Sequence, residues 1–323
     1  MRPFKGAQPT PDRTTLTVVL ALAVTIAAAA LAQERPGPLI LTTHPLRGGV
    51  YWVEGGNSNT GFIVGDKGVV VIDSQMTIAA GQKAIAEIAK VTAKRIDNIV
   101  LTHGDPDHVG GLPAYPAGTP IIAQENTRSQ IKASITDPNG GPVLGPLYEA
   151  LANFLPTKTI GGTETEVLDG VRMVLMHVAP AHRSGDLIVY LPAHRIVFGG
   201  DIIITTFDYP VIHIGGSSLG WIASMKAMLA LDADTYVSGH GPMETKDMLR
   251  ARLRSVEQRR EAVKVMVEQN KSLAEVKQAL AEKVPDPRFP SFVETTYEEL
   301  AEGYPAATPS WTKLVRVRVN KAP

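Results

Sequence analysis

The 323-residue sequence contains no cysteine, and this absence removes two kinds of structure at once. No disulfide can form, and no thiolate is available as a metal ligand. The fold must therefore be stabilised by its apolar core, with any bound metal adding to that stability.

An excess of positive charge is also missing. Lys plus Arg and Asp plus Glu each number 32, and without the N-terminal 32 residues the counts become 29 and 31. A nucleic-acid-binding protein usually carries a basic surface, which this balance does not supply. We therefore expect a small-molecule substrate and no nucleic-acid partner.

Long apolar runs are absent apart from one near the N-terminus. Leu16 to Ala32 is apolar, follows Arg2, Lys5 and Arg13, and ends in Ala30-Leu31-Ala32. A basic start, an apolar stretch and a small-x-small site are typical of a secretory signal peptide. We predict a signal peptide over residues 1–32, cleaved after Ala32, and a periplasmic or secreted protein with no membrane contact. The alternative is an uncleaved N-terminal membrane anchor, because the run is long enough to span a bilayer.

The remaining chain predicts two sheets covered by helices. Short apolar runs bounded by Gly and Asp turns predict strands over 50–53, 60–64, 69–72, 96–101, 121–123, 166–168, 171–178, 186–191, 196–198 and 236–238. Helical spacing predicts helices over 77–91, 124–133 and 219–229, with a further helix beginning at Val109. Residues 136–142 break the chain and are expected to form a flap near the site.

A helical extension is predicted to follow the main domain. Glu244 to Gln269 has apolar residues on one helical face, and Ser272 with Glu275 forms a capping box. We place the main domain at residues 33–245 and the extension at 246–323. The extension carries no metal or nucleophile motif, so we expect it to pack on the core or to mediate a homodimer.

One turn concentrates residues of metal-ligand type. The segment His103-Gly-Asp105-Pro-Asp107-His108 directly follows the apolar strand that ends at Leu101. Imidazole suits zinc and iron, and carboxylates suit harder ions and can bridge two cations. Three further residues of this type stand at predicted strand ends among small neighbours: His182, Asp201 and His240. This layout is typical of a hydrolytic site with two metal ions.

At these residues the chain resembles the metallo-β-lactamase-fold superfamily, whose signature is His-x-His-x-Asp-His followed by His, Asp and His. The supporting stretches occur in order over roughly residues 40–245: 61–66, 69–73, 101–103, 197–201 and 237–241. The resemblance implies an α/β (α+β) fold, a four-layer αββα sandwich. It also implies one metal bound by His103, position 105 and His182, a second bound by Asp107, His108 and His240, and Asp201 bridging the two.

Asp105 departs from the signature, which has a second histidine at this point. Three carboxylates and a bridging hydroxide would balance the charge of two divalent cations, where the usual pattern keeps one positive charge. Flavodiiron relatives have a Glu here and bind iron, so zinc is the first expectation and iron or manganese the alternative. On charge alone, Asp105→His should strengthen zinc binding. Alternatively, Asp105 does not touch a metal and lies beside a single ion.

The sequence leaves more than one possible role open for several other residues. Asp73 ends a buried strand and either orients the metal loop or caps a turn. Arg183 either binds a substrate carboxylate, neutralises Asp105 or lies on the surface. His213 and Tyr209 follow Asp201 on a segment that lines the substrate cleft in relatives, and either could contact substrate. Three further histidines have no ligand-like context and are expected to be ordinary surface or core residues: His44, His177 and His194.

The leading hypothesis is a metallohydrolase that activates water against an ester, lactone, thioester or amide bond, with Asp107 moving a proton. β-Lactams are one possible amide substrate, but Ile204 stands where the commonest lactamase class has a carboxylate-binding Lys. The alternatives are an iron-dependent redox enzyme of the same fold and a non-catalytic metal-binding protein. Fold resemblance alone does not name the substrate.

Overall fold

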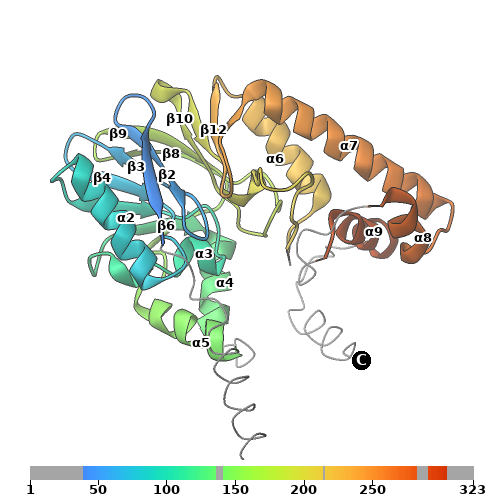
Figure 1. Ribbon diagram of the computed structural model, residues 1–323, viewed down its shortest axis with the longest axis horizontal. Coiled ribbons are helices and arrows are strands. Elements are labelled where there is room, and N and C mark those ends of the chain that lie inside the picture. Colours follow the sequence, from blue (N-terminus) through green and yellow to red (C-terminus); the bar gives the residue numbers. More distant parts are fainter. Residues whose placement is uncertain (1–38, 136–140, 214, 282–289, 304–323) are drawn as a thin grey trace, which may run out of the picture. The chain divides into compact units, whose positions relative to one another are not determined.

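Two β-sheets form the centre of the molecule (Figure 1). The computed structural model describes residues 39–135, 141–213, 215–281 and 290–303. The first sheet has the order β1-β2-β3-β4-β5-β6-β7, with these bounds: Leu41–Pro45, Val50–Gly55, Thr60–Val64, Val69–Ile72, Ile96–Val100, Ile121–Gln124 and Lys158–Ile160. The second has the order β13-β12-β11-β10-β9-β8, with these bounds: Glu244–Thr245, Thr235–Val237, Ile196–Phe198, Ile188–Leu191, Val171–Met176 and Thr163–Leu168.

The two sheets pack face to face through apolar side chains that alternate along their strands. Ile63 and Val70 of the first sheet belong to one buried cluster with Leu175, Val189 and Phe198 of the second. Burial of such side chains is the main favourable contribution to folding. The expected sheet-on-sheet sandwich is confirmed.

Helices cover the outer faces. On the first sheet, α2 (Ile78–Val91) contacts β1, and α4 (Glu125–Ile135) contacts β6 and β7. On the second, Trp221 of α6 (Ser218–Ala230) and Leu249 of α7 (Lys246–Glu268) share a buried cluster with Tyr190, Val197 and Tyr236. The architecture is therefore the expected four-layer αββα sandwich.

The described part of the C-terminal extension packs on this core. Phe292, at the start of α9 (Phe292–Glu302), joins the same cluster as α6 and α7. A small separate cluster joins α7, α8 (Leu273–Leu280) and α9 through Val263, Val276 and Val293. The Ser272–Glu275 capping box at the start of α8 is confirmed. No helix among the described residues is both long and apolar enough to cross a membrane.

Several element boundaries differ from expectation, β1, β7 and α5 (Gly141–Ala150) were not predicted, and two of the differences have a clear cause. Val109 ends the short helix α3 (Pro106–Val109) rather than beginning one, because Pro106 occupies the first helical position and starts the helix earlier. The long helix begins at Lys246, since Thr245 caps it and Glu244–Thr245 pairs with β12. The expected flap falls largely on residues 136–140, outside the described residues, and α5 follows them.

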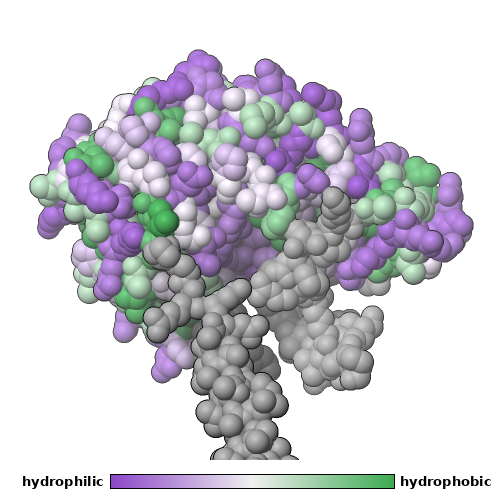
Figure 2. Space-filling model, viewed as in Figure 1, coloured by the Kyte–Doolittle hydropathy of each residue, from purple (hydrophilic) through white to green (hydrophobic). Residues whose placement is uncertain are grey.

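The face seen in Figure 2 is mostly hydrophilic, with apolar side chains of the described residues occurring in small groups. Scattered apolar side chains are normal on protein surfaces. The candidate metal ligands instead lie together at one edge of the two sheets.

Candidate metal centre

The metal loop is held by the end of β5 and by α3. β5 is followed directly by Leu101, Thr102 and His103, all fully or almost fully buried. Asp105 stands in extended conformation at the N-cap of α3, as expected for a residue that precedes proline. Since Asp107 and His108 lie in the single turn that follows, the whole loop faces the sheet edge.

The second sheet supplies the other residues at the same edge. His182 follows β9, Asp201 lies in the 3₁₀ turn η5 (Gly200–Ile202) after β11, and His240 follows β12. β11 and β12 are parallel neighbours, so their carboxyl ends meet. A Cβ atom on Gly239 would lie 1.9 Å from Asp201 Oδ1, so only glycine permits this close approach.

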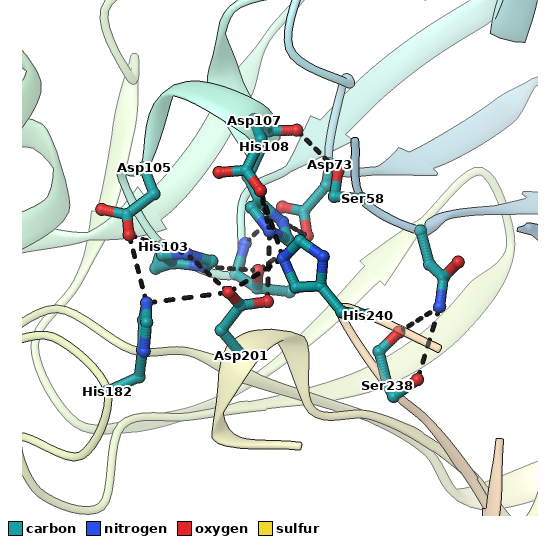
Figure 3. Close-up of polar contacts among 12 residues, drawn as sticks. Ser58, Asp73, His103, Asp105, Asp107, His108, His182, Asp201, Ser238 and His240 are labelled. Carbon is teal, nitrogen blue, oxygen red and sulfur yellow. Dashed lines mark hydrogen bonds and ion pairs between the residues drawn. The ribbon is translucent and has the colours of Figure 1, made fainter. Parts of the chain in front are cut away.

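One group of ligand atoms surrounds the Nε2 atoms of His103 and His182 (Figure 3). His103 Nε2 lies 3.7 Å from Asp105 Oδ2 and 3.8 Å from Asp201 Oδ2. His182 Nε2 lies 3.1 Å and 3.7 Å from the same two oxygens. This is the set that the resemblance implies for one metal, together with Asp201.

A second group lies on the other side of Asp201 (Figure 3). His240 Nε2 is 3.1 Å from Asp107 Oδ2 and 3.1 Å from Asp201 Oδ2. His108 Nε2 is 3.7 Å from Asp107 Oδ2 and 3.2 Å from Asp201 Oδ1. The Asp201 carboxylate therefore lies between the two groups and contacts both.

The spacing of these atoms fits metal ions. A tetrahedral ion bound at about 2.1 Å keeps its ligand atoms about 3.4 Å apart, inside the range of contacts found here. His103 Nε2, His108 Nε2 and Asp201 Oδ1 are also buried without a hydrogen-bond partner among the described residues. Buried polar atoms are normally satisfied, so these unpaired atoms around the shared Asp201 carboxylate support cation binding here.

Hydrogen bonds fix the histidine rings so that Nε2 faces inward. Asp73 Oδ2 accepts from His108 Nδ1 at 2.8 Å and from Thr102 Oγ1 at 2.7 Å. Thr102 Oγ1 in turn lies 3.1 Å from His103 Nδ1, and His182 Nδ1 is 2.7 Å from the Val211 carbonyl. Such contacts on the far nitrogen orient metal-binding histidines. These hydrogen bonds favour the interpretation that Asp73 orients the metal loop.

The carboxylates and histidines of the site shift one another's pKa values. Burial opposes protonation of His240, yet the Asp201 carboxylate raises the pKa of His240 to about 10. Burial also opposes ionisation of Asp201, but His240 and His108 hold the pKa of that carboxyl well below its usual range. Metal ligands must be deprotonated to bind, so a cation would displace these protons.

Asp105 has more partners than the sequence indicated. Its Oδ1 lies 2.6 Å from Arg183 Nε and accepts from Gln130 Nε2 at 3.2 Å, and its Oδ2 lies 2.9 Å from His213 Nδ1. Burial alone would raise the pKa of Asp105, but the Arg183 guanidinium and the contact with His182 hold it well below its usual range. Arg183 is thus a partly buried partner of Asp105 and not a fully exposed surface residue.

A cavity of about 560 Å³ opens beside the two groups. His213 lines it, and burial together with the Arg183 guanidinium lowers the pKa of His213 to about 4. Apolar side chains make up much of the remaining wall: Met76, Tyr148, Ile204, Phe207 and Val211. We call this space the site cavity.

Tyr209 lies elsewhere. It lines a neighbouring cavity, where its ring stacks on Phe292 at 5.8 Å and Arg259 lies 4.5 Å above it. The histidines without ligand-like context also lie apart: His44 pairs with Glu54, His177 bonds the Asp186 carbonyl and His194 bonds the Gly48 carbonyl.

Three residues at the site were missed. Gln130 of α4 and Tyr148 of α5 reach it only through packing of these helices, and no local motif marks them. Asp186 accepts from the backbone N–H groups of Ala181 and Arg183 and so shapes the loop around His182. Its position in the 181–186 loop, which is rich in small residues, is the sequence feature that could have indicated a role for Asp186 near His182. Burial raises the pKa of Asp186 to about 6.

The fold and this arrangement agree with comparisons to known proteins. The family model described as the metallo-beta-lactamase superfamily matches residues 53–240, more than half of the chain. The chain therefore belongs to the metallo-beta-lactamase superfamily.

Among curated relatives, it is similar to the 2,4-dinitroanisole O-demethylase subunit alpha of Nocardioides sp. (strain JS1661), 31% identical over 205 residues, or 62% of this chain and 57% of that protein. It is also similar to the linear primary-alkylsulfatase of Pseudomonas sp. (strain ATCC 19151), 25% identical over 54% of this chain and 40% of that protein. The chain thus spans about half the length of these relatives.

Solved structures show the same fold. A metallo-beta-lactamase from Pontibacter korlensis aligns with a TM-score of 0.57 at 17% identity, covering 68% of this chain and 99% of that one. The inverting sec-alkylsulfatase Pisa1 from Pseudomonas sp. aligns with a TM-score of 0.63 at 16% identity, covering 85% of this chain and 52% of that one.

Proposed function

We propose that this protein is a metal-dependent hydrolase with a binuclear centre. One ion would be held by His103, Asp105 and His182, the other by Asp107, His108 and His240, with Asp201 between them. The observation that carries the proposal is the pair of ligand groups that share the Asp201 carboxylate beside an open cavity. Zinc is the first expectation, and the Asp105 carboxylate also suits iron or manganese.

Bound divalent ions would supply Lewis acidity and lower the pKa of water to near neutrality. The protein's own residues then have distinct tasks. Asp107, with about a quarter of its side chain exposed, faces the site cavity and is the group that would accept or return a proton during hydrolysis. The buried histidines, held from behind by Asp73 and the Val211 carbonyl, keep the ligand atoms in place.

The cavity wall supports a proposal about the substrate class. Five apolar or aromatic side chains line it, which favours a substrate with an apolar portion next to the cleaved bond. We propose a carboxylic ester, lactone or thioester ahead of an amide. A β-lactam is less favoured, because Ile204 occupies the wall at the position of the lactamase lysine. The names of the relatives add aryl methyl ethers and alkyl sulfates to the substrates worth testing.

The test combines metal analysis with a substrate panel. Protein reconstituted with zinc, iron or manganese is analysed for bound metal and assayed on chromogenic esters, lactones, thioesters, β-lactams and alkyl sulfates. We expect close to two ions per chain and hydrolysis of at least one ester-type substrate. Asp201→Asn should lose both ions. The control variant Asp232→Asn should retain them, because Asp232 is an exposed carboxylate that pairs with Arg195. A wild-type protein that binds no metal would refute the proposal.

An iron-dependent redox enzyme is the second candidate, and Asp105 is the observation that favours it. A carboxylate occupies the place where flavodiiron relatives have Glu, and the chain is 25% identical over 149 residues to an anaerobic nitric oxide reductase flavorubredoxin of Aliivibrio salmonicida (strain LFI1238). That match covers 27% of the flavorubredoxin. Selective retention of iron, with oxygen or nitric oxide consumption and no hydrolysis, would support this candidate. Two bound ions with neither activity would indicate a non-catalytic metal-binding protein.

A further inference from the structure

The two oxygens of Asp105 have different neighbours. Oδ1 is held by Arg183 Nε at 2.6 Å and by Gln130 Nε2 at 3.2 Å. Oδ2 faces the ligand group, 3.1 Å from His182 Nε2 and 3.7 Å from His103 Nε2, and it also lies 2.9 Å from His213 Nδ1. Asp105 therefore presents a single atom to the ligand group, as the Nε2 of a histidine would.

The partnership with Arg183 is buried. The Asp105 side chain is 5% exposed and that of Arg183 is 13% exposed. Taking either charge out of water alone costs several kcal/mol, so each needs the other in this position. The backbone of Arg183 is also fixed, because its N–H donates to Asp186 Oδ2 at 2.9 Å.

We propose that Asp105 and Arg183 together form one electroneutral unit that replaces the neutral histidine of the superfamily signature. This inference rests on the proposed function. Asp105 adds one negative charge relative to histidine, and Arg183 returns one positive charge at contact distance. The centre then keeps the net positive charge of the usual pattern. Arg183 is a positioning residue, acting on the metals through Asp105.

Among the described residues around Asp105, no second lysine or arginine is available for this task. Asp73 lies behind His108 and Asp186 lies beneath the loop of His182, so both add negative charge near the centre. His213 also contacts Asp105, but it does so through Oδ2, on the side of the ligand group, whereas Arg183 lies at Oδ1. Among the residues that line the site cavity, Arg183 is the sole lysine or arginine.

The Asp105–Arg183 unit reverses the predicted effect of Asp105→His on zinc binding. Charge counting on the ligands alone predicts that Asp105→His strengthens zinc binding. With Arg183 present, that change leaves an unpaired buried guanidinium beside two cations. Zinc affinity should therefore fall, by about 10-fold to 100-fold as for other changes next to metal ligands. Removing the guanidinium as well should restore most of it, so the two substitutions are strongly non-additive.

The experiment uses a matched pair at Arg183. Zinc affinity is measured by competition with a chromophoric chelator, and the visible absorption spectrum is recorded after cobalt(II) loading. We expect Asp105→His to weaken zinc binding, Asp105→His/Arg183→Met to recover it with a cobalt spectrum of intact geometry, and Asp105→His/Arg183→Lys to remain weak. Met and Lys are similar in length and differ in charge. Arg172→Met, at an exposed arginine of β9, is the control and should change nothing.

Three results would overturn the inference: Asp105→His binding zinc as tightly as wild type, Met and Lys giving the same result, or the double variant failing to recover. If Asp105→His does not fold, Asp105→Asn with and without Arg183→Met provides the same comparison. A wild-type protein without metal would instead refute the proposed function. The two failures are therefore distinguishable.

Discussion

At the scale of single residues, Asp73 contacts residues behind both ligand groups. Its backbone is held at φ 61°, an uncommon conformation for a residue with a side chain. From there one carboxylate accepts from Thr102 N, Thr102 Oγ1 and His108 Nδ1. Through Thr102 it also sets the ring of His103, so it directs one histidine of each ligand group. Backbone strain of this kind clusters at functional sites.

Asp73→Asn tests this role. The amide keeps the size of the side chain but replaces one acceptor oxygen with an NH₂ group that faces donors. We expect zinc affinity of both ligand groups to fall by about 10-fold to 100-fold with little change in secondary structure. A chelator competition titration measures the effect, with Asp232→Asn as the exposed control. Unchanged affinity would show that Asp73 only caps its turn.

The sequence predicts most of the candidate ligands but not the partners of Asp105. His103, Asp107, His108, His182, Asp201 and His240 could be found because each follows a predicted strand whose end must lie at a sheet edge. The partners of Asp105 could not be assigned, because Gln130 and Arg183 reach it from segments 25 and 78 positions along the chain. Which of several readings holds for Arg183 depends on tertiary packing, and no local pattern encodes it.

At the scale of elements, α7 and β13 support the wall of the site cavity. Arg252 of α7 donates to Glu244 Oε1 of β13 through Nε at 3.0 Å and Nη2 at 2.7 Å, and to the Phe207 carbonyl at 2.8 Å. Phe207 lines the site cavity. The extension is thus linked to the cavity wall, and β13 was missed by sequence reasoning because its two residues are too few to form a pattern.

Arg252→Ala should be strongly destabilising. Glu244 is 5% exposed, so removing its partner leaves a buried charge uncompensated, at a cost of about 3–5 kcal/mol. The matched control is Arg250→Ala on the same helix. Its partner Asp247 is 89% exposed, and surface pairs contribute about 0–1 kcal/mol. Urea denaturation of both variants measures the difference, and equal losses would contradict the role given to the buried pair.

At the scale of the whole molecule, the ligand groups join the two sheets. His103, Asp105, Asp107 and His108 follow strands of the first sheet, and His182, Asp201 and His240 follow strands of the second. A bound ion therefore connects both halves of the sandwich at one edge. Since the unfolded chain does not hold this arrangement, metal binding should stabilise the folded state.

Chelation should accordingly lower the melting temperature. If free metal is about 100 times its Kd, binding contributes about 2.7 kcal/mol per site. For a domain of 150–250 residues each kcal/mol corresponds to about 2–4 °C. Scanning calorimetry with and without EDTA checks this shift. Asp201→Asn provides the control, because a protein that cannot bind the ions should not respond to EDTA.

The N-terminal prediction concerns residues outside the described ranges and stays a prediction. We propose a periplasmic or secreted protein whose N-terminus is Gln33. Intact-mass measurement of protein recovered from the periplasm or medium should find this residue first. A mass that begins at Met1 on membrane-associated protein would favour the uncleaved anchor. Light scattering of the same sample tests whether the C-terminal helices form a homodimer.

The order of the strands also has a consequence for synthesis. Each sheet is built from one continuous stretch of chain, residues 41–160 and then 163–245. As the chain emerges from its N-terminus, the first sheet can form while the second is still incomplete. The first ligand group needs His182 and the second needs His240. Both histidines are synthesised long after the loop that contains residues 103–108. Under the proposed function, metal loading would therefore be a late event, and a chain interrupted before residue 240 would hold at most a partial centre.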